Sequence, residues 1–144
     1  MKEVKYIPLD LVKAGNNPNI IWKVKDVSQD KRGNVLYRVV AAEDNDAFIY
    51  LYEHQIAPVP LTTEILEKNG WKLLKHHERN SYDDVSWSSY HKPAETNISL
   101  VFYPEEEAFF LFLYAQEISE TPIRYIHQLQ HILFGLGINY EMEV

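Results

Sequence analysis

Three short runs near the start of the chain alternate apolar and polar residues, a period of two that is typical of β-strands with one buried face. They cover residues 20–27, 35–42 and 48–52. In the third run, Phe48, Tyr50 and Tyr52 fall on the same face. The pattern therefore predicts three strands within residues 1–60.

Turn residues separate these runs. Residues 30–34 include Gly33 and Asn34, which tolerate positive φ, and residues 44–46 are Asp-Asn-Asp. Short strands at this spacing predict a small, strongly bent sheet. We interpret residues 1–60 as an SH3-like β module.

A short helix is predicted just after this boundary. Thr62 is a suitable N-cap, because its hydroxyl accepts a hydrogen bond from an otherwise unpaired backbone N–H. Leu61 and Leu66 have the spacing of a hydrophobic staple, and Gly70 supplies a left-handed residue at the end of the helix. Such a short helix is unstable alone, so it must pack against other elements.

Strand patterns return downstream, in residues 71–75, 82–91, 96–103 and 108–115. The last two runs, joined by a turn at residues 104–107, are expected to form an antiparallel hairpin. The final run is apolar on both faces, which predicts a central strand covered on both sides.

The last predicted element is a helix with Thr121 as N-cap and Pro122 at its first position, ending at Gly135 and Gly137. Its apolar arc covers roughly 200°, wider than the ~100° of a surface helix. Gln130 falls inside this arc, and a buried amide without partners costs roughly 1–3 kcal/mol. We therefore expect the Gln130 side chain to hydrogen-bond the backbone of a neighbouring strand or loop.

These elements predict an α+β protein in which a small N-terminal SH3-like β module packs on an antiparallel sheet with two helices. The predicted division is residues 1–60 for the β module and residues 61–144 for the helix, the β-meander and the C-terminal helix. Residues 138–144 are a candidate final strand.

The composition excludes several kinds of site and disfavours several kinds of partner. The chain has no cysteine, which excludes disulfides, a thiol nucleophile and cysteine-ligated metals. No continuous apolar run opens the chain, and its longest run is too short for a membrane helix, so we expect a cytoplasmic protein without a membrane partner. Residues 61–144 hold six basic and thirteen acidic residues, which disfavours binding to a phosphate backbone there.

His127 and His131 have the spacing by which a helix offers two imidazoles to zinc. A catalytic zinc helix also carries a Glu after the first His, where this chain has Gln128, and no third ligand is identifiable. We therefore expect no metal and no cofactor. We interpret Arg124, His127, Gln128 and His131 as a candidate interaction surface instead.

Two further functions stay open as alternatives. Trp22, Lys23, Lys25 and Arg38 combine rings and cations in the β module, a mixture that binds single-stranded nucleic acid by stacking and charge. A hydrolase would need a pocket holding at least two members of an acidic and imidazole set, namely Asp83, Asp84, Glu117 and His91. The chain has no nucleophile elbow and no glycine-rich phosphate loop, so no catalytic residue is assigned.

Two segments of this chain are similar to one known family. The stretch Pro58–Trp71, PVPLTTEILEKNGW, and the helix Tyr125–Phe134, YIHQLQHILF, resemble signatures of short uncharacterised proteins of gut Bacteroidetes and their phages or mobile elements. The family's closing helix reads Val-His-Gln-Leu-Gln-Asn, whereas this chain has Ile126 and His131 in place of the Val and the Asn. The resemblance implies origin and architecture, but no activity.

The aromatic content points to an interaction protein. Ten Tyr, six Phe and three Trp, together with the two-sided apolar run Phe109–Tyr114, exceed what two helices would cover. We therefore expect a non-enzymatic accessory protein of a phage or mobile element, which self-associates or binds an unidentified protein.

Overall fold

The computed structural model describes residues 4–15, 17–93 and 95–144. The chain divides into two compact units: the first combines Met1–Pro60 with Tyr125–Val144, and the second is Leu61–Arg124. In the described residues the protein is mostly β, with two five-stranded antiparallel sheets and two short α-helices. The predicted division placed the C-terminal helix in the second module, whereas the structure groups it with the first unit.

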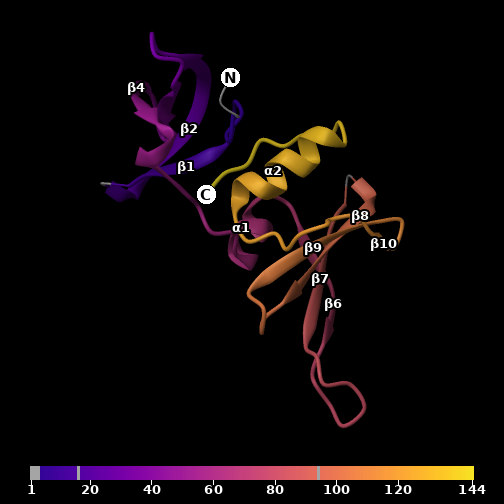
Figure 1. The fold of residues 1–144 in the computed structure, drawn as a ribbon. Helices are drawn as coiled ribbons and strands as arrows, with labels where there is room; N and C mark the ends of the chain where they lie inside the picture. Colours follow the sequence, from indigo (N-terminus) through magenta and orange to yellow (C-terminus); the bar gives the residue numbers. More distant parts are fainter. Residues whose placement is uncertain (1–3, 16, 94) are drawn as a thin grey trace. The chain divides into compact units, whose positions relative to one another are not determined.

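The first unit contains a sheet with the strand order β4-β3-β2-β1-β5 (Figure 1). Its strands are β1 (Leu11–Ala14), β2 (Asn17–Gln29), β3 (Val35–Ala41), β4 (Asp44–Tyr52) and β5 (Ile56–Pro58). A 3-10 helix, η1 (Glu53–Gln55), connects β4 to β5. Strand β5 pairs with β1, and every neighbouring pair in the sheet is antiparallel.

Sequence pattern predicted β2, β3 and β4 but not β1 or β5, because runs of four and three residues are too short to show alternation. The turn predicted at residues 44–46 is wrong, since β4 already begins at Asp44 and the chain reverses at residues 42–43. No pairing joins β4 to β5 in the described residues, so these strands form an open sheet rather than a closed barrel.

The core of the first unit is built from alternate residues of these strands. Val12, Trp22, Val24 and Tyr37 are buried together with Tyr6, which precedes β1. The pairing of β2 with β3 shifts register between Val24 and Asp26. A bulge of this kind bends a strand, which explains how one long strand curves around a small core.

The second unit contains a sheet with the order β10-β9-β8-β7-β6. Its strands are β6 (Lys72–His77), β7 (Trp87–Lys92), β8 (Glu95–Tyr103), β9 (Ala108–Leu113) and β10 (Gln116–Glu117). The predicted hairpin of the last two long runs is confirmed, because β8 and β9 pair in register from Ile98 with Leu113 to Tyr103 with Ala108.

Residues 78–86 form a loop that extends past the ends of β6 and β7 (Figure 1). The strand predicted to begin at Tyr82 begins at Trp87 instead. The Asn80 side-chain oxygen accepts the backbone N–H groups of Tyr82 and Asp83 at 2.8 and 2.9 Å. This Asx-type turn uses N–H groups that a strand would need for its ladder.

Helix α1 (Thr63–Lys68) forms as its sequence signals predicted. The Thr62 hydroxyl accepts the Ile65 N–H at 3.2 Å, and Gly70 has φ of 87° at the end of the helix. The Trp71 N–H donates to the Leu66 carbonyl at 3.0 Å, which folds the chain back on the helix. Leu66 and Trp71 are both buried, so local caps and apolar contacts hold this helix.

The strand predicted at residues 108–115 is β9, which lies between β8 and β10 and is therefore an interior strand of its sheet. In the described residues its contact on the β10 side is short, because β10 has two residues and a single bridge joins Phe109 to Ile123. The backbone of Ile123 donates to and accepts from Phe109 at 2.8 Å in both directions. The two-sided apolar pattern therefore marked a strand with a neighbour on each side, although β8 lies at the middle of the five.

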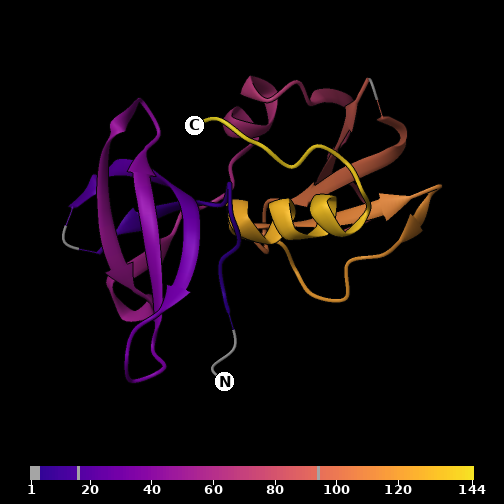
Figure 2. The same ribbon diagram turned by 90° about the horizontal axis from the view of Figure 1, so that it is seen from above.

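Helix α2 (Ile126–Gly135) begins at Ile126 rather than after Thr121. The bridge at Ile123 keeps the preceding residues extended, and Tyr125 forms a further bridge with Pro60. Gly137 ends the helix with φ of 73°, and the chain then turns back along it without forming a strand (Figure 2). Neither described helix has the length and apolar character needed to cross a membrane.

Candidate functional site

Gln130 attaches α2 to strand β1 and to the segment before it. Its side-chain oxygen accepts the Leu11 N–H at 3.0 Å, and its side-chain nitrogen donates to the carbonyls of Leu9 and Tyr140 at 2.8 and 3.0 Å. The side chain is completely buried. The prediction that this amide bonds the backbone of neighbouring segments is confirmed.

A buried carboxylate reinforces the same attachment. Asp10 is completely buried and accepts the Ile7 N–H at 2.9 Å, while its other contact is Nε2 of His131 at 2.6 Å. Burial raises the pKa of the Asp10 carboxyl, and the hydrogen bond from His131 opposes this shift. This pair links the segment before β1 to the middle of α2.

His127 is buried, with 8% of its surface exposed, although the helical pattern placed it on the polar face. Its ring packs against those of Tyr6 and Tyr125, whose centroids are 5.1 and 6.0 Å away. Burial lowers the pKa of His127 to about 4, and the charges of His131 and Lys5 act in the same direction. His127 is therefore a neutral, packed ring at neutral pH.

The four residues predicted as an interaction surface do not form one surface in a single unit. Arg124 belongs to the second unit, whereas His127, Gln128 and His131 belong to the first. Gln128 accepts the Tyr125 N–H at 3.0 Å and so caps α2. In the described parts of the chain, no group of three or more potential ligands is arranged to hold a metal ion.

The residues predicted for nucleic-acid binding are mostly engaged elsewhere. Trp22 is part of the core. Lys23 pairs with Glu141 at 3.1 Å, and Arg38 contacts the Asp26 carboxylate at 2.6 and 2.7 Å.

Lys25 is the exposed member of the predicted set, at the bulge of β2. Two of the three predicted cations therefore already have carboxylate partners.

The residues of the hydrolase alternative are spread along the second unit. The Asp83 carboxylate lies 3.0 Å from Nε2 of His77, and Asp84 lies 3.7 Å from Arg79. Glu117 is exposed on β10, and His91 lies on β7. Neither of the hollows described below is lined by any of the four hydrolase candidates.

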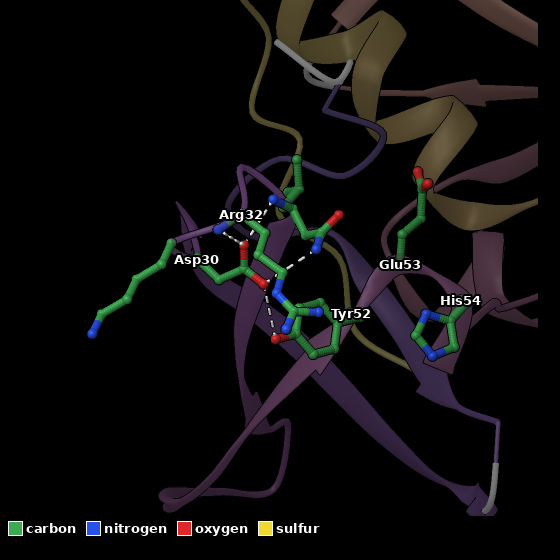
Figure 3. A pocket seen from close by; sticks show the side chains of 8 residues that line it. Asp30, Arg32, Tyr52, Glu53 and His54 are labelled. Atoms are coloured by element: carbon green, nitrogen blue, oxygen red, sulfur yellow. Dashed lines mark hydrogen bonds between the residues drawn. The ribbon is translucent and has the colours of Figure 1, made fainter.

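A hollow of about 680 Å³ lies in the first unit, between the β2–β3 turn and η1 (Figure 3). Its volume falls in the range of roughly 300–1,000 Å³ that is usual for ligand sites. The lining residues are Asp30, Lys31, Arg32, Asn34, Val35, Tyr52, Glu53 and His54. The hollow therefore combines aromatic rings with charges of both signs.

The Asp30 carboxylate organises this hollow. It accepts the backbone N–H groups of Arg32 and Asn34 at 2.8 and 2.9 Å, and the Tyr52 hydroxyl donates to it at 3.1 Å (Figure 3). The Asn34 hydrogen bonds lower the pKa of Asp30, and the bond to Asp30 raises the pKa of Tyr52. Asp30 therefore stays ionised at neutral pH and Tyr52 stays protonated.

An aromatic track runs along β4 into this hollow; we define it as Phe48, Tyr50, Tyr52 and His54. Phe48 and Tyr50 are 52% and 55% exposed, and their ring centroids lie 6.0 Å apart. The Tyr52 and His54 rings are nearly parallel at 6.0 Å. Arg38 lies over the Phe48 ring at 5.8 Å.

Sequence alternation placed three of these rings on one face but did not show that this face is exposed. The structure shows that the opposite face of β4, which includes Leu51, is the buried one, so the face with the track is exposed to solvent.

A second hollow, of about 470 Å³, lies on the outer face of the second sheet. Its lining includes Leu74 and Lys75 from β6, Trp87 from β7, Val101 from β8 and Phe112 from β9. Lys75 is the single charged residue in its lining. This hollow is thus mainly apolar, in contrast to the first.

No protein-family model matches this chain, and no curated protein or solved structure does so either. The function must therefore be argued from the chemistry of these two surfaces.

Proposed function

We propose that this chain is a non-enzymatic accessory protein of a phage or mobile element that binds an extended segment of another protein along the aromatic track. The single observation that carries the proposal is the exposure of Phe48 and Tyr50 side by side on β4. Aromatic residues and Arg provide much of the binding energy of protein interfaces. Exposing two neighbouring rings to water without a partner is unfavourable.

The position of the track favours an extended occupant. Strand β4 is at the edge of its sheet, and the track follows the strand direction into the hollow beside η1. The hollow offers the cations Lys31 and Arg32 as well as the carboxylate of Glu53. We expect a segment with apolar side chains over the track and both an acidic and a basic side chain near the hollow.

The charges around the track favour a protein over a nucleic acid. A polyanion needs cations that are not already neutralised. Here Arg38 is held by Asp26 within 2.7 Å, and Asp30 and Glu53 offset the charges of Lys31 and Arg32 at the hollow. Single-stranded nucleic acid is therefore the less favoured occupant of this aromatic surface.

The pKa shifts of Asp30 and Tyr52 support a non-enzymatic role for these two groups. A general acid or base works best with a pKa near the working pH. The pKa of Asp30 is lowered by its hydrogen bonds and that of Tyr52 is raised, so both shifts move away from neutrality. Asp30 is also occupied in holding the turn, which leaves it a structural group.

The topology supports an SH3-like first unit within this proposal. The strand order β4-β3-β2-β1-β5, with η1 before β5 and β5 paired to β1, is that of a small bent five-stranded sheet around one long strand, β2. The proposed family origin rests on the Pro58–Trp71 and Tyr125–Phe134 segments.

The test is selection of binders from a displayed random-peptide library on the immobilised full chain. Selected peptides should bind the double variant Phe48→Ser/Tyr50→Ser at least tenfold more weakly than the wild type. The matched control is Tyr82→Ser, which removes a completely exposed ring from the second unit. It should leave the affinity unchanged.

Equal affinity for the wild type and the double variant would overturn the proposal. A salt-dependent shift with single-stranded DNA that the double variant loses would favour the nucleic-acid alternative. Light scattering showing a dimer that the double variant loses would identify a second copy of this chain as the occupant instead.

A further inference from the structure

The outer face of the second sheet carries a hollow that the proposed function does not use. Val101 and Phe112 are half-buried in its lining, and Trp87 stands beside them. These side chains come from three neighbouring strands, so the hollow lies across the sheet rather than in a loop. An apolar side chain placed here would remove apolar surface from water on both partners.

The charge at this hollow is confined to its β6 side. Lys75 is the single charged residue of the lining, and its ammonium lies 5.7 Å from the centre of the Trp87 ring. His77 stacks on the same ring at 5.4 Å and contacts Asp83 at 3.0 Å. The His77–Asp83 pair lies outside the lining and leaves Lys75 as the charge that faces an occupant.

The hollow is also open to approach from the edge of the sheet. Strand β6 is an edge strand, and Leu74, at its register shift, is 63% exposed. Lys72 is exposed on the same strand. A basic edge strand with an exposed leucine suits a segment that brings carboxylates together with an apolar side chain.

We propose that this hollow binds a second protein through a segment in which an acidic side chain adjoins a bulky apolar one. The apolar side chain covers Val101 and Phe112, and the carboxylate pairs with the Lys75 ammonium. Because this surface belongs to the second unit and the aromatic track to the first, the chain then links two proteins. This inference goes beyond the proposed function and does not depend on it.

A second copy of the chain is the poorer occupant. A symmetric contact between two copies through this face brings the Lys75 of one copy near the Lys75 of the other, and two like charges repel each other.

The experiment selects capped nine-residue peptides built from Leu, Val, Phe, Ser, Glu and Lys on the immobilised full chain carrying Phe48→Ser/Tyr50→Ser, so that the aromatic track does not retain them. We expect the retained peptides to carry Glu beside an apolar residue. They should bind Lys75→Glu at least tenfold more weakly than the wild type. Binding should also move the Trp87 emission to shorter wavelength, since Trp22 and Trp71 are already buried.

The matched control is Lys68→Glu, which makes the same charge change on α1 of the same unit. This control should change the peptide affinity by less than twofold. The variant Leu74→Asp should weaken peptide binding, because it puts a carboxylate beside the hollow. Retained peptides without an excess of Glu would overturn the proposal. So would equal affinity for Lys75→Glu, an unchanged Trp87 emission, or a dimer of the unliganded chain that Lys75→Glu abolishes.

Discussion

The two α-helices in the described residues differ in how far polar groups hold them. Helix α1 is fixed by its cap, in which the Thr62 hydroxyl accepts the N–H of Ile65 three residues later, and by the buried side chains Leu66 and Trp71. Helix α2 buries Ile126, Leu129 and Leu133, and it is held in addition by polar groups, since Gln130 and His131 bond residues more than a hundred positions earlier in the chain. The first attachment depends on local geometry and apolar burial, whereas the second also depends on matching buried donors to acceptors.

This difference predicts different sensitivities. Apolar packing tolerates changes of shape to some degree, but a buried polar group that loses its partner keeps its full desolvation cost. The attachment of α2 should therefore respond to pH and to single polar substitutions, whereas that of α1 should respond to loss of volume.

The largest expected effect is on the apolar attachment. Trp71 is 1% exposed, and replacing it with Ala should lower the free energy of unfolding of the second unit by about 4 kcal/mol. Hydrogen exchange of the β8 and β9 amides measures this loss. The control Lys72→Ala, at an exposed neighbour, should change it by less than about 0.5 kcal/mol. A Trp71→Ala variant with unchanged protection would contradict apolar attachment.

The polar attachment is tested by Gln130→Leu. This change leaves the Leu11 N–H and the carbonyls of Leu9 and Tyr140 without their partner, and should cost about 3 kcal/mol in the first unit. Urea unfolding followed by exchange of the β1 amides measures the effect. Gln116→Leu, on exposed β10, is the control. An undiminished stability of Gln130→Leu would show that the amide is dispensable.

The third prediction concerns acid. The unfolded chain binds a proton at His127 with a pKa near 6.5, whereas burial lowers the folded pKa to about 4. Stability is therefore lost as the pH falls, by about 2 kcal/mol between pH 7.5 and pH 5. Unfolding measured across this range should show the loss in the first unit.

His127→Phe is the comparison for this pH effect, because it keeps a buried ring and removes the titration. Burial raises the pKa of Asp10, so its protonation acts in the opposite direction as the pH falls. Subtracting the pH profile of His127→Phe stability from that of the wild type gives the contribution of the His127 imidazole. Parallel pH profiles for the two proteins would rule out His127 as the cause.

The smallest effect is expected at the cap of α1. Thr62→Ala removes the acceptor of the Ile65 N–H and should lower the stability of the second unit by about 1 kcal/mol. Thr62→Ser keeps the hydroxyl and should retain most of it. The same exchange measurement on β8 and β9 distinguishes the two, and equal losses would exclude the cap as the source.

The candidate surfaces were only partly predictable from sequence. Alternation in β4 placed Phe48, Tyr50 and Tyr52 together, but period two does not say which face meets water. Lys23 and Arg38 looked available to a ligand, because their partners Glu141 and Asp26 come close only through folding. The hollow beside Lys75 draws its walls from four strands, and no short motif encodes such a site.

The sequence alone determined what depends on neighbours along the chain: α1 with its Thr62 cap and Gly70 turn, the β8–β9 hairpin, and the burial of an amide at Gln130. Tertiary structure decided the start of α2, where the bridge between Ile123 and Phe109 keeps the chain extended, and the place of α2 in the first unit. The physical reason is how far apart along the chain the interacting groups lie. Caps and turns satisfy backbone groups within a few residues, whereas the partners of Gln130, His131 and Ile123 are set by which segments meet in space.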